Sequence, residues 1–209
     1  MSIHGVSEQF AAYLARELDS DQRQELRMGY GLEILLGEIV KLIIIISSAW
    51  ILGILPQVLT ITISAGILRL ASGGEHCSAY YRCLIGGTVW FLLLGWGVDS
   101  LHAVLSPAVI NANAGLLFFI SLSIILKYAP GETENKPITG EAEREKFKKW
   151  SVFIMFSYGL MLVLFSNLAV LSSLVLPMAV GIMAQAFTVS PAGYDFIHFI
   201  DRVLDFSKG

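Results

Sequence analysis

Charged residues are scarce in this chain of 209 residues. Asp, Glu, Lys and Arg make up 15% of it, whereas an average soluble domain contains about 25%. Hydrophobic residues make up 55%, and the mean hydropathy is +0.68. This composition excludes an ordinary soluble domain and predicts a membrane protein, with the lipid bilayer as its main partner. The net charge of -3 is small, and we expect no nucleic-acid partner.

We also expect no signal peptide in the N-terminal region, because no basic segment is followed there by an apolar run. Instead, Phe10, Tyr13, Leu14 and Leu18 recur at helical spacing, with charged residues between them. This pattern predicts an amphipathic helix, which would lie on the membrane surface or pack on the protein's own loops.

Apolar segments that could cross a membrane occur six times. They cover residues 39–55, 58–71, 84–101, 108–126, 151–165 and 168–187. The last two are joined by Ser166 and Asn167, which predicts a tight helical hairpin. We therefore predict an all-α, polytopic membrane helix bundle that forms a single domain. Its parts would be an N-terminal amphipathic region (1–38), the transmembrane bundle (39–187) and a C-terminal tail (188–209).

Lys and Arg are absent from three of the predicted turns, namely those near Pro56, at residues 99–107 and near Asn167. All 14 basic residues lie in the other segments or at the helix ends next to them. Because cytoplasmic loops carry the excess of Lys and Arg, both termini and residues 72–83 should be cytoplasmic. That compartment is reducing, which argues against a disulfide between Cys77 and Cys83.

Residues 73–83, GGEHCSAYYRC, contain the two cysteines and one of the four histidines. An imidazole beside a thiol can take its proton and produce a nucleophilic thiolate, so His76 and Cys83 are a candidate base and nucleophile. Three alternatives remain. The residues could simply pack at the membrane edge, His76, Cys77 and Cys83 could bind zinc without a fourth ligand, or the cysteines could form a redox pair. We expect no metal or cofactor.

Geometry restricts the catalytic interpretation. Residues seven apart on one helix are separated by about 10 Å along its axis, whereas a thiol and its base must approach within about 3 to 4 Å. We therefore predict that Gly73 and Gly74 interrupt the helix and that a bent segment brings His76 to Cys83. A backbone N–H near Cys83, or the side chain of Arg69 or Arg82, could stabilise an oxyanion. Both arginines could equally be positive charges that fix the topology.

The pattern R-x4-G-E-H-x6-C resembles the core motif of the AgrB family of bacterial accessory gene regulator proteins. It consists here of Arg69, Gly74, Glu75, His76 and Cys83. Residues 127–138, KYAPGETENKPI, resemble a second motif of that family, and residues 31–35, GLEIL, resemble a third. The order and spacing of the three motifs agree over nearly the whole chain.

This resemblance implies a cysteine endopeptidase (a thiol protease) in the cell membrane of a Gram-positive bacterium. It would cleave the C-terminal tail of an AgrD-type quorum-sensing propeptide through an acyl thioester, leading to a cyclic (thio)lactone. Cys83 would be the nucleophile and His76 its base. The surrounding motif would include Arg69, Gly73, Gly74 and Glu75.

Other roles are open at this stage. Glu33, Glu38 and Arg82 are candidates for substrate contact or for orienting His76, and no third catalytic residue can be chosen among them. Cys77 departs from the family pattern. A homodimer is one way to cover the polar edge of the short second and fifth helices. The main alternative function is a non-catalytic membrane exporter of peptides or a scaffold.

Overall fold

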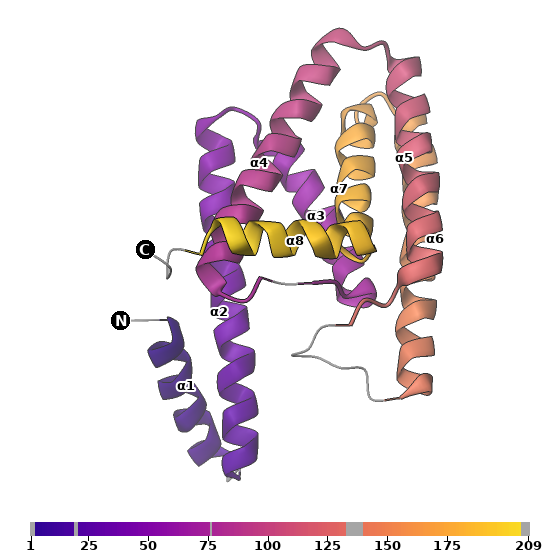
Figure 1. Cartoon of the computed structure of the whole chain (residues 1–209). Coiled ribbons are helices and arrows are strands. Elements are labelled where there is room, and N and C mark those ends of the chain that lie inside the picture. Colours follow the sequence, from indigo (N-terminus) through magenta and orange to yellow (C-terminus); the bar gives the residue numbers. More distant parts are fainter. Residues whose placement is uncertain (1–2, 19–20, 76, 133–139, 206–209) are drawn as a thin grey trace. The chain divides into compact units, whose positions relative to one another are not determined.

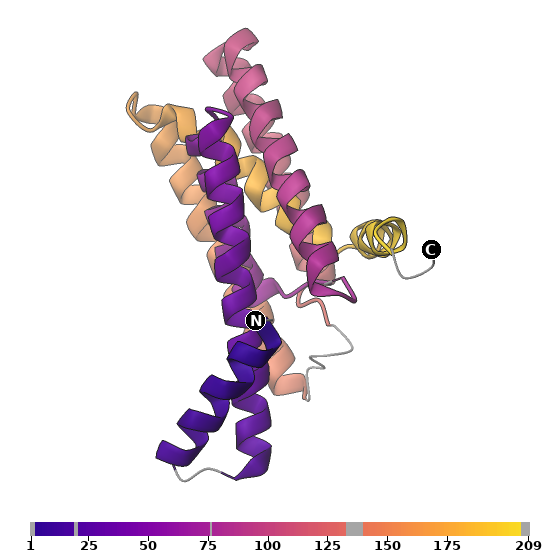
Figure 2. The same ribbon diagram turned by 90° about the vertical axis from the view of Figure 1, so that its left-hand side faces the viewer.

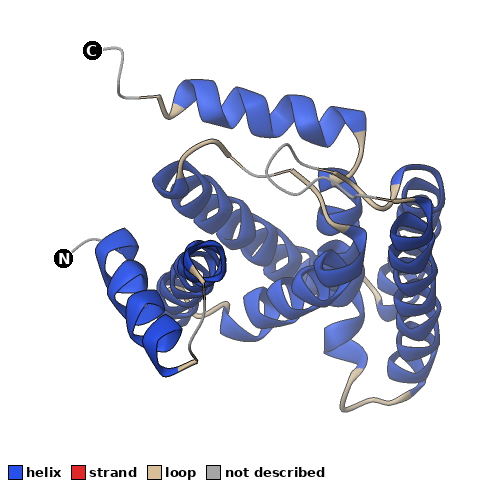
Figure 3. Ribbon diagram, turned by 90° about the horizontal axis from the view of Figure 1, so that it is seen from below, coloured by secondary structure: helices blue, strands red, loops and turns tan. Residues whose placement is uncertain are grey.

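The computed structural model describes residues 3–18, 21–75, 77–132 and 140–205. In this part of the chain, helices account for nearly all of the regular structure and no strand occurs (Figures 1 and 3). The helices are α1 (Ile3–Glu17), α2 (Gln22–Ile51), α3 (Leu55–Ser72), α4 (Tyr80–Val104), α5 (Pro107–Tyr128), α6 (Glu141–Asn167), α7 (Val175–Thr188) and α8 (Pro191–Val203). The predicted all-α bundle is confirmed.

Five of the described helices, α2 to α6, are long and apolar enough to cross a membrane. Helix α7 is shorter, and a 3-10 turn at Ser172–Leu174 precedes it. Residues 172–188 and helix α8 meet at a bend of 82°, and this bent pair gives a sixth span if it is counted as one. These helices fit a multi-pass membrane protein.

The chain divides into two compact units, residues 1–47 and 48–209. In the first unit, α1 buries a face of small residues, Ser7, Ala11 and Ala15. Ala11 lies beside Gly29 of α2, where the absence of a side chain permits close approach. The aromatic residues of the predicted amphipathic pattern, including Phe10 and Tyr13, are exposed. They are therefore available to a membrane surface.

Helix α7 is the centre of the second unit. It packs mainly on α3 and α5, and ten of its 14 residues are buried. Gly181 allows the closest contact, because a Cβ at this position would lie 2.5 Å from the backbone oxygen of Ile61. Small residues at helix interfaces allow this kind of packing in membranes. A helix covered by protein in this way does not need to match the thickness of the bilayer.

The predicted sixth helix begins later than expected. Ser166 and Asn167, predicted to form the turn of the hairpin, are the last two residues of helix α6, and residues 168–171 form a turn before the 3-10 segment. The side-chain amide of Asn167 donates to the carbonyl oxygen of Val163 at 2.7 Å, and the backbone N–H of Ser172 turns back to Leu168. The apolar run from residue 168 concealed this turn, because apolarity does not distinguish a turn from a helix.

Three segments that were predicted on the same side of the membrane meet at one end of the second unit. They are residues 72–83, the loop after α5, and helix α8 with the residues that follow it (Figure 1). At the opposite end, the side chain of Gln57 donates to Asp99 at 2.7 Å. Segments that were predicted on opposite sides of the membrane therefore lie at opposite ends of the second unit.

Candidate active site

The segment between α3 and α4 begins with Gly73 and Gly74, two positions that only glycine can occupy without strain. Helix α3 ends at Ser72, and φ is +65° at Gly73 and +126° at Gly74. A Cβ at Gly73 would lie 2.3 Å from the carbonyl oxygen of Gly131, and a Cβ at Gly74 would lie 2.7 Å from Oγ1 of Thr188. The described residues from 73 to 79 are not helical, so the predicted interruption of the helix is confirmed.

The second sequence motif lies directly against these glycines. Gly73 and Gly131 form an isolated parallel β-bridge, in which the N–H of Gly131 donates to the carbonyl oxygen of Ser72 at 2.8 Å. The hydroxyl of Tyr194 on α8 donates to the carbonyl oxygen of Glu132, also at 2.8 Å. The two motifs, about 60 residues apart in the sequence, therefore form one structural element.

Arg69, in the last turn of α3, donates hydrogen bonds to the backbone of the irregular segment. Its Nη2 donates to the carbonyl oxygens of Glu75 at 2.8 Å and Gly74 at 3.4 Å. Its Nη1 is 3.4 Å from both Gln185 Oε1 and Thr188 Oγ1 on α7. The guanidinium thus organises backbone carbonyls, a task for which its fixed fork of donors is suited.

Gln185 on α7 completes this network from a buried position, with 3% of its surface exposed. Its Nε2 donates to the carbonyl oxygen of Gly73 at 2.7 Å and to Oγ of Ser72 at 3.0 Å, while its Oε1 accepts from Arg69. Both the NH2 group and the oxygen of the side-chain amide therefore form hydrogen bonds. The described start of the segment is therefore fixed to α3 and to α7.

Cys83 stands in the first turn of α4, where its N–H donates to the carbonyl oxygen of Ala79 at 3.3 Å. Neither cysteine forms a disulfide, and both are partly exposed. A hydrogen bond with Cys83 raises the pKa of the Cys77 thiol above its ordinary value, and burial raises it further. Cys77 therefore stays protonated at neutral pH.

His76 lies outside the described residues, so its predicted approach to Cys83 stays a prediction, as does a zinc site that would include it. Its two neighbours in the chain are described. The carbonyl oxygen of Glu75 accepts from Arg69, and Cys77 contacts Cys83.

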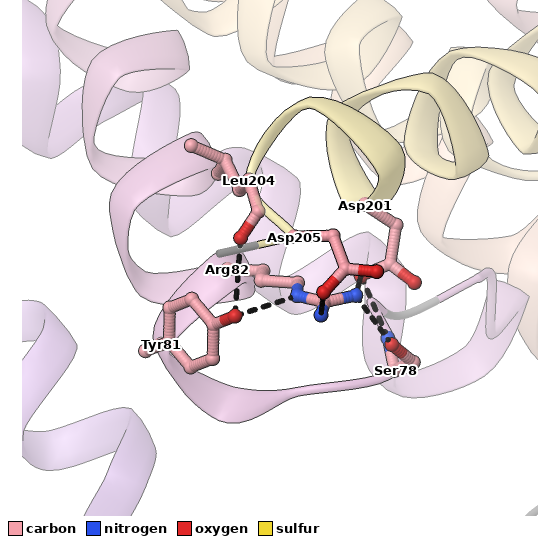
Figure 4. A network of polar contacts seen from close by, with 6 residues as sticks. All are labelled: Ser78, Tyr81, Arg82, Asp201, Leu204 and Asp205. Carbon is pink, nitrogen blue, oxygen red and sulfur yellow. Dashed lines mark hydrogen bonds and ion pairs between the residues drawn. The ribbon is translucent and has the colours of Figure 1, made fainter. Parts of the chain in front are cut away.

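Arg82 belongs to a separate polar network with the C-terminal end of the chain (Figure 4). Its Nη2 lies 2.7 Å from Oδ1 of Asp205, and its Nη1 lies 3.4 Å from Oδ1 of Asp201. The same Asp201 oxygen accepts from the N–H of Ser78 at 3.1 Å. The hydroxyl of Tyr81 accepts from Nε of Arg82 at 3.0 Å. The two arginines proposed as oxyanion donors thus both make internal contacts.

Comparisons with known proteins agree with the two motifs that meet at this site. The family model described as accessory gene regulator B matches residues 7–189. The chain belongs to the AgrB family. It is 30% identical over 190 residues to accessory gene regulator protein B of Staphylococcus aureus, covering 90% of this chain and 94% of the relative. It is 26% identical over 206 residues to an AgrB-like protein of Clostridium perfringens, covering 95% and 96%. No solved structure matches the chain.

Two further candidates of this AgrB-family chain lie on α2, in the first unit. Glu38 forms an ion pair with Lys41 one turn later, at 2.7 Å. Glu33 lines a groove of about 470 Å³ between α1 and α2, together with Ser7 and Tyr30. A role for either glutamate in substrate contact remains a prediction.

Several residues that shape the site were missed in the sequence. Gln185 is a polar side chain within an apolar segment, and such residues are costly in membranes unless they serve a purpose. That signal was available. Asp201, Asp205 and Tyr194 lie in a segment that was assigned to a tail. There, Ser190 followed by Pro191 is a helix-start signal, and apolar residues recur at helical spacing from Tyr194 onward.

Proposed function

We propose that this AgrB-family chain is a membrane cysteine endopeptidase that removes the C-terminal tail of an AgrD-type quorum-sensing propeptide. Cys83 is the nucleophile and His76 is the general base. The product is the precursor of a cyclic (thio)lactone peptide. No metal or cofactor takes part in this scheme.

The observation that carries this proposal is the contact between Cys77 and Cys83 across an irregular segment. Cys77 directly follows His76 in the chain, and consecutive Cα atoms are 3.80 Å apart. The segment therefore returns to the first turn of α4 at the residue beside the proposed base. A regular helix would have kept these two parts of the sequence about 10 Å apart.

The reaction keeps the acyl group activated as a thioester until the ring closes. His76 takes the proton from the Cys83 thiol, Sγ bonds to the scissile carbonyl carbon, and the C–N bond breaks. The tail leaves as an amine that carries the proton, and the remaining peptide stays on Cys83 as a thioester. A thiol within the propeptide then attacks the thioester, forms a thiolactone and returns Cys83 as a thiol.

Cys83 is favoured over Cys77 because it stands at the cysteine of the family motif, from which Cys77 departs. The pKa of Cys77 is raised, chiefly by its hydrogen bond with Cys83, so Cys77 stays protonated at neutral pH. Cys77 can then donate its hydrogen bond to the Cys83 thiolate and so stabilise it. This role suits a residue that supports the nucleophile without attacking the substrate.

The site faces the cytoplasm in this proposal, because basic residues gather at the end of the bundle where the motifs meet. An amphipathic propeptide lying on the same leaflet would present its cleavage site at a fixed height. Glu33 and Glu38 would contact the substrate, and a second copy of the chain could cover a polar edge. Residence in the cell membrane belongs to the same proposal.

The experiment uses the purified full-length chain in lipid vesicles and a propeptide with an amphipathic head, an internal cysteine and a cleavable tail. Tail release is followed by mass spectrometry for the parent and for Cys83→Ala, His76→Ala and Cys77→Ala. We expect the first two substitutions to abolish cleavage and Cys77→Ala to retain it. Acyl-enzyme should accumulate when the internal cysteine of the propeptide is replaced by alanine.

Two results would overturn the proposal. If Cys77→Ala abolishes cleavage and Cys83→Ala does not, the nucleophile is misassigned. If all three variants cleave the propeptide as the parent does, or if the parent does not cleave it, the thiol mechanism is wrong. In the latter case, transport of the intact peptide into or out of the vesicles would favour the exporter or scaffold.

A further inference from the structure

The first turn of α4, which carries Cys83, has a weak start. Its N-cap residue is Ala79, whose side chain cannot accept a hydrogen bond from the helix, and no side-chain cap is present. Alanine is among the poorest N-cap residues, and a helix that starts this way frays readily. Some other part of the protein must therefore hold this turn if the thiol is to have a fixed position.

Helix α8 supplies such a support through an apolar contact. It meets residues 172–188 at a bend of 82°, and Figure 2 shows it end-on, to one side of the other helices of the second unit. Ser190 caps α8 by accepting from the N–H of Gly193 at 3.1 Å. Phe196 of α8 packs on Trp90 of α4, with ring centroids 5.2 Å apart, and on Phe187 of α7 at 5.7 Å. These contacts fix α8 beside the start of α4.

The C-terminal end of α8 adds polar contacts to the weak turn, as Figure 4 shows. The Asp201 carboxylate accepts from the backbone N–H of Ser78, just before the N-cap, at 3.1 Å. The Tyr81 hydroxyl donates to the carbonyl oxygen of Leu204 at 3.0 Å. The Arg82 guanidinium bonds to Oγ of Ser78 at 3.1 Å and to Asp205 at 2.7 Å. We name Arg82, Asp201 and Asp205 the latch.

The charges of the latch are partly withdrawn from solvent. The side chains of Arg82, Asp201 and Asp205 are 12%, 17% and 19% exposed. Fully exposed ion pairs contribute little, whereas removing one partner of a buried pair leaves an uncompensated charge. The latch carboxylates also lie near the N-terminus of α4, where negative charge is favourable.

We propose that helix α8 is part of the peptidase site and that the three latch residues are positioning residues for Cys83. They hold Ser78 and the first turn of α4 in place, so that the thiol keeps a fixed orientation toward the segment that carries the base. This inference rests on the proposed function. It assigns Arg82 to the positioning of Cys83, whereas the sequence left substrate contact, orientation of His76 and oxyanion stabilisation open for this residue.

The test uses the full-length chain in lipid vesicles with the propeptide. Asp201→Asn, Asp205→Asn and Arg82→Gln should each lower kcat by about 10- to 100-fold, because a displacement of about 1 Å in a catalytic group can cost that much. KM should change much less, since the latch does not touch the substrate. Exchanging the charges, with Arg82→Asp and Asp205→Arg together, should recover part of the lost kcat. Asp195→Asn, an exposed acid on the same helix, is the matched control and should leave kcat unchanged.

Hydrogen exchange provides a readout that does not depend on catalysis. The latch variants should speed exchange of the amides in residues 78–84, while peptides from α5 keep the parent rates. This comparison also shows whether a variant has lost its fold as a whole. Asp205→Glu keeps a carboxylate at this position. In this variant the amides of residues 78–84 should therefore still exchange slowly.

Failure of this inference can be told apart from failure of the proposed function. If Cys83→Ala abolishes cleavage but all three latch variants keep the parent kcat and exchange rates, the latch has no positioning role and the peptidase proposal stands. A rise in KM at unchanged kcat for Arg82→Gln would also overturn it, because that result indicates substrate contact. If Cys83→Ala still cleaves, the proposed function fails. The exchange rates of residues 78–84 then decide by themselves whether the latch holds this turn.

Discussion

We expect Gln185→Met to loosen the irregular segment after α3 while the bundle stays folded. Gln185 is 3% exposed, and its amide donates to the carbonyl oxygen of Gly73 and to Oγ of Ser72. Methionine has a similar volume and shape but no donor, so the substitution removes hydrogen bonds with little change in packing. The effect should therefore be confined to the residues that Gln185 holds.

The size of this effect follows from the two acceptors that lose their donor, the carbonyl oxygen of Gly73 and Oγ of Ser72. A buried acceptor without a partner costs about 1 to 3 kcal/mol, and side-chain hydrogen bonds inside membranes are often worth less than in water. Taking about 1 to 2 kcal/mol for each of the two acceptors, the segment should open more easily by about 2 to 4 kcal/mol. This corresponds to about a 30- to 700-fold increase in the open population.

Hydrogen exchange of the chain in lipid, read by mass spectrometry, measures this population. Peptides that cover residues 73–79 should exchange faster in Gln185→Met by a factor in that range, and cleavage of the propeptide should slow. Gln57→Met is the matched control. It removes an amide that donates to Asp99 at the opposite end of α3, so exchange of residues 73–79 should not change.

Unchanged exchange of residues 73–79 in Gln185→Met would refute the reasoning, since it would mean that this amide does not hold the segment. Faster exchange in both variants would refute it as well. The perturbation would then act through α3 as a whole and not through the hydrogen bonds of Gln185.

Three further predictions concern the same segment. Gly73→Ala should abolish cleavage, because its Cβ would lie 2.3 Å from a backbone oxygen at positive φ, whereas Gly97→Ala, with open space around it, should cleave normally in the same assay. Arg69→Lys should slow cleavage by about 10-fold or more, because an ammonium lacks the fixed fork of donors with which the guanidinium bonds to the irregular segment and to α7 at once; full activity would show that Arg69 acts only as a charge. Cys77 should be alkylated slowly by iodoacetamide at pH 8, since a raised pKa leaves less thiolate at any pH below it. Cys83→Ala removes the main cause of that shift, so alkylation of Cys77 should become faster, and equal rates in parent and variant would contradict the assignment.

The sequence predicted those features of the fold that depend on local physics. Gly73 and Gly74 interrupt the helix as expected, because tolerance of positive φ belongs to the residue itself. Helix α6 ends at Asn167, two residues after the predicted end, so the two residues expected to form the turn are helical. The start of α7 was also predicted wrongly, because an apolar run from residue 168 onward is compatible with both a turn and a helix, and only the packing of α7 between α3 and α5 decides where the helix begins.

The contacts that build the site could not be predicted in the same way. Gln185 and Gly73 are 112 residues apart in the sequence, and Arg82 and Asp205 are 123 apart. A single sequence contains no information about such pairs. What it does contain is the unusual residue, such as a polar Gln185 in an apolar helix or an Ala79 at a helix start. Each of these marks a place where a partner is needed, without naming the partner.

The identity of the partners follows from a requirement of the backbone. An irregular segment cannot satisfy its own carbonyl groups, and at the edge of a membrane it cannot rely on water. The carbonyl oxygens of residues 73, 74 and 75 each accept from a side chain, the first from Gln185 and the other two from Arg69. Arg69, which the family motif singles out, and Gln185, which it does not, thus have the same task. The proposed base follows these three residues directly in the sequence, so the donors that satisfy the backbone also fix Glu75, the residue that precedes it.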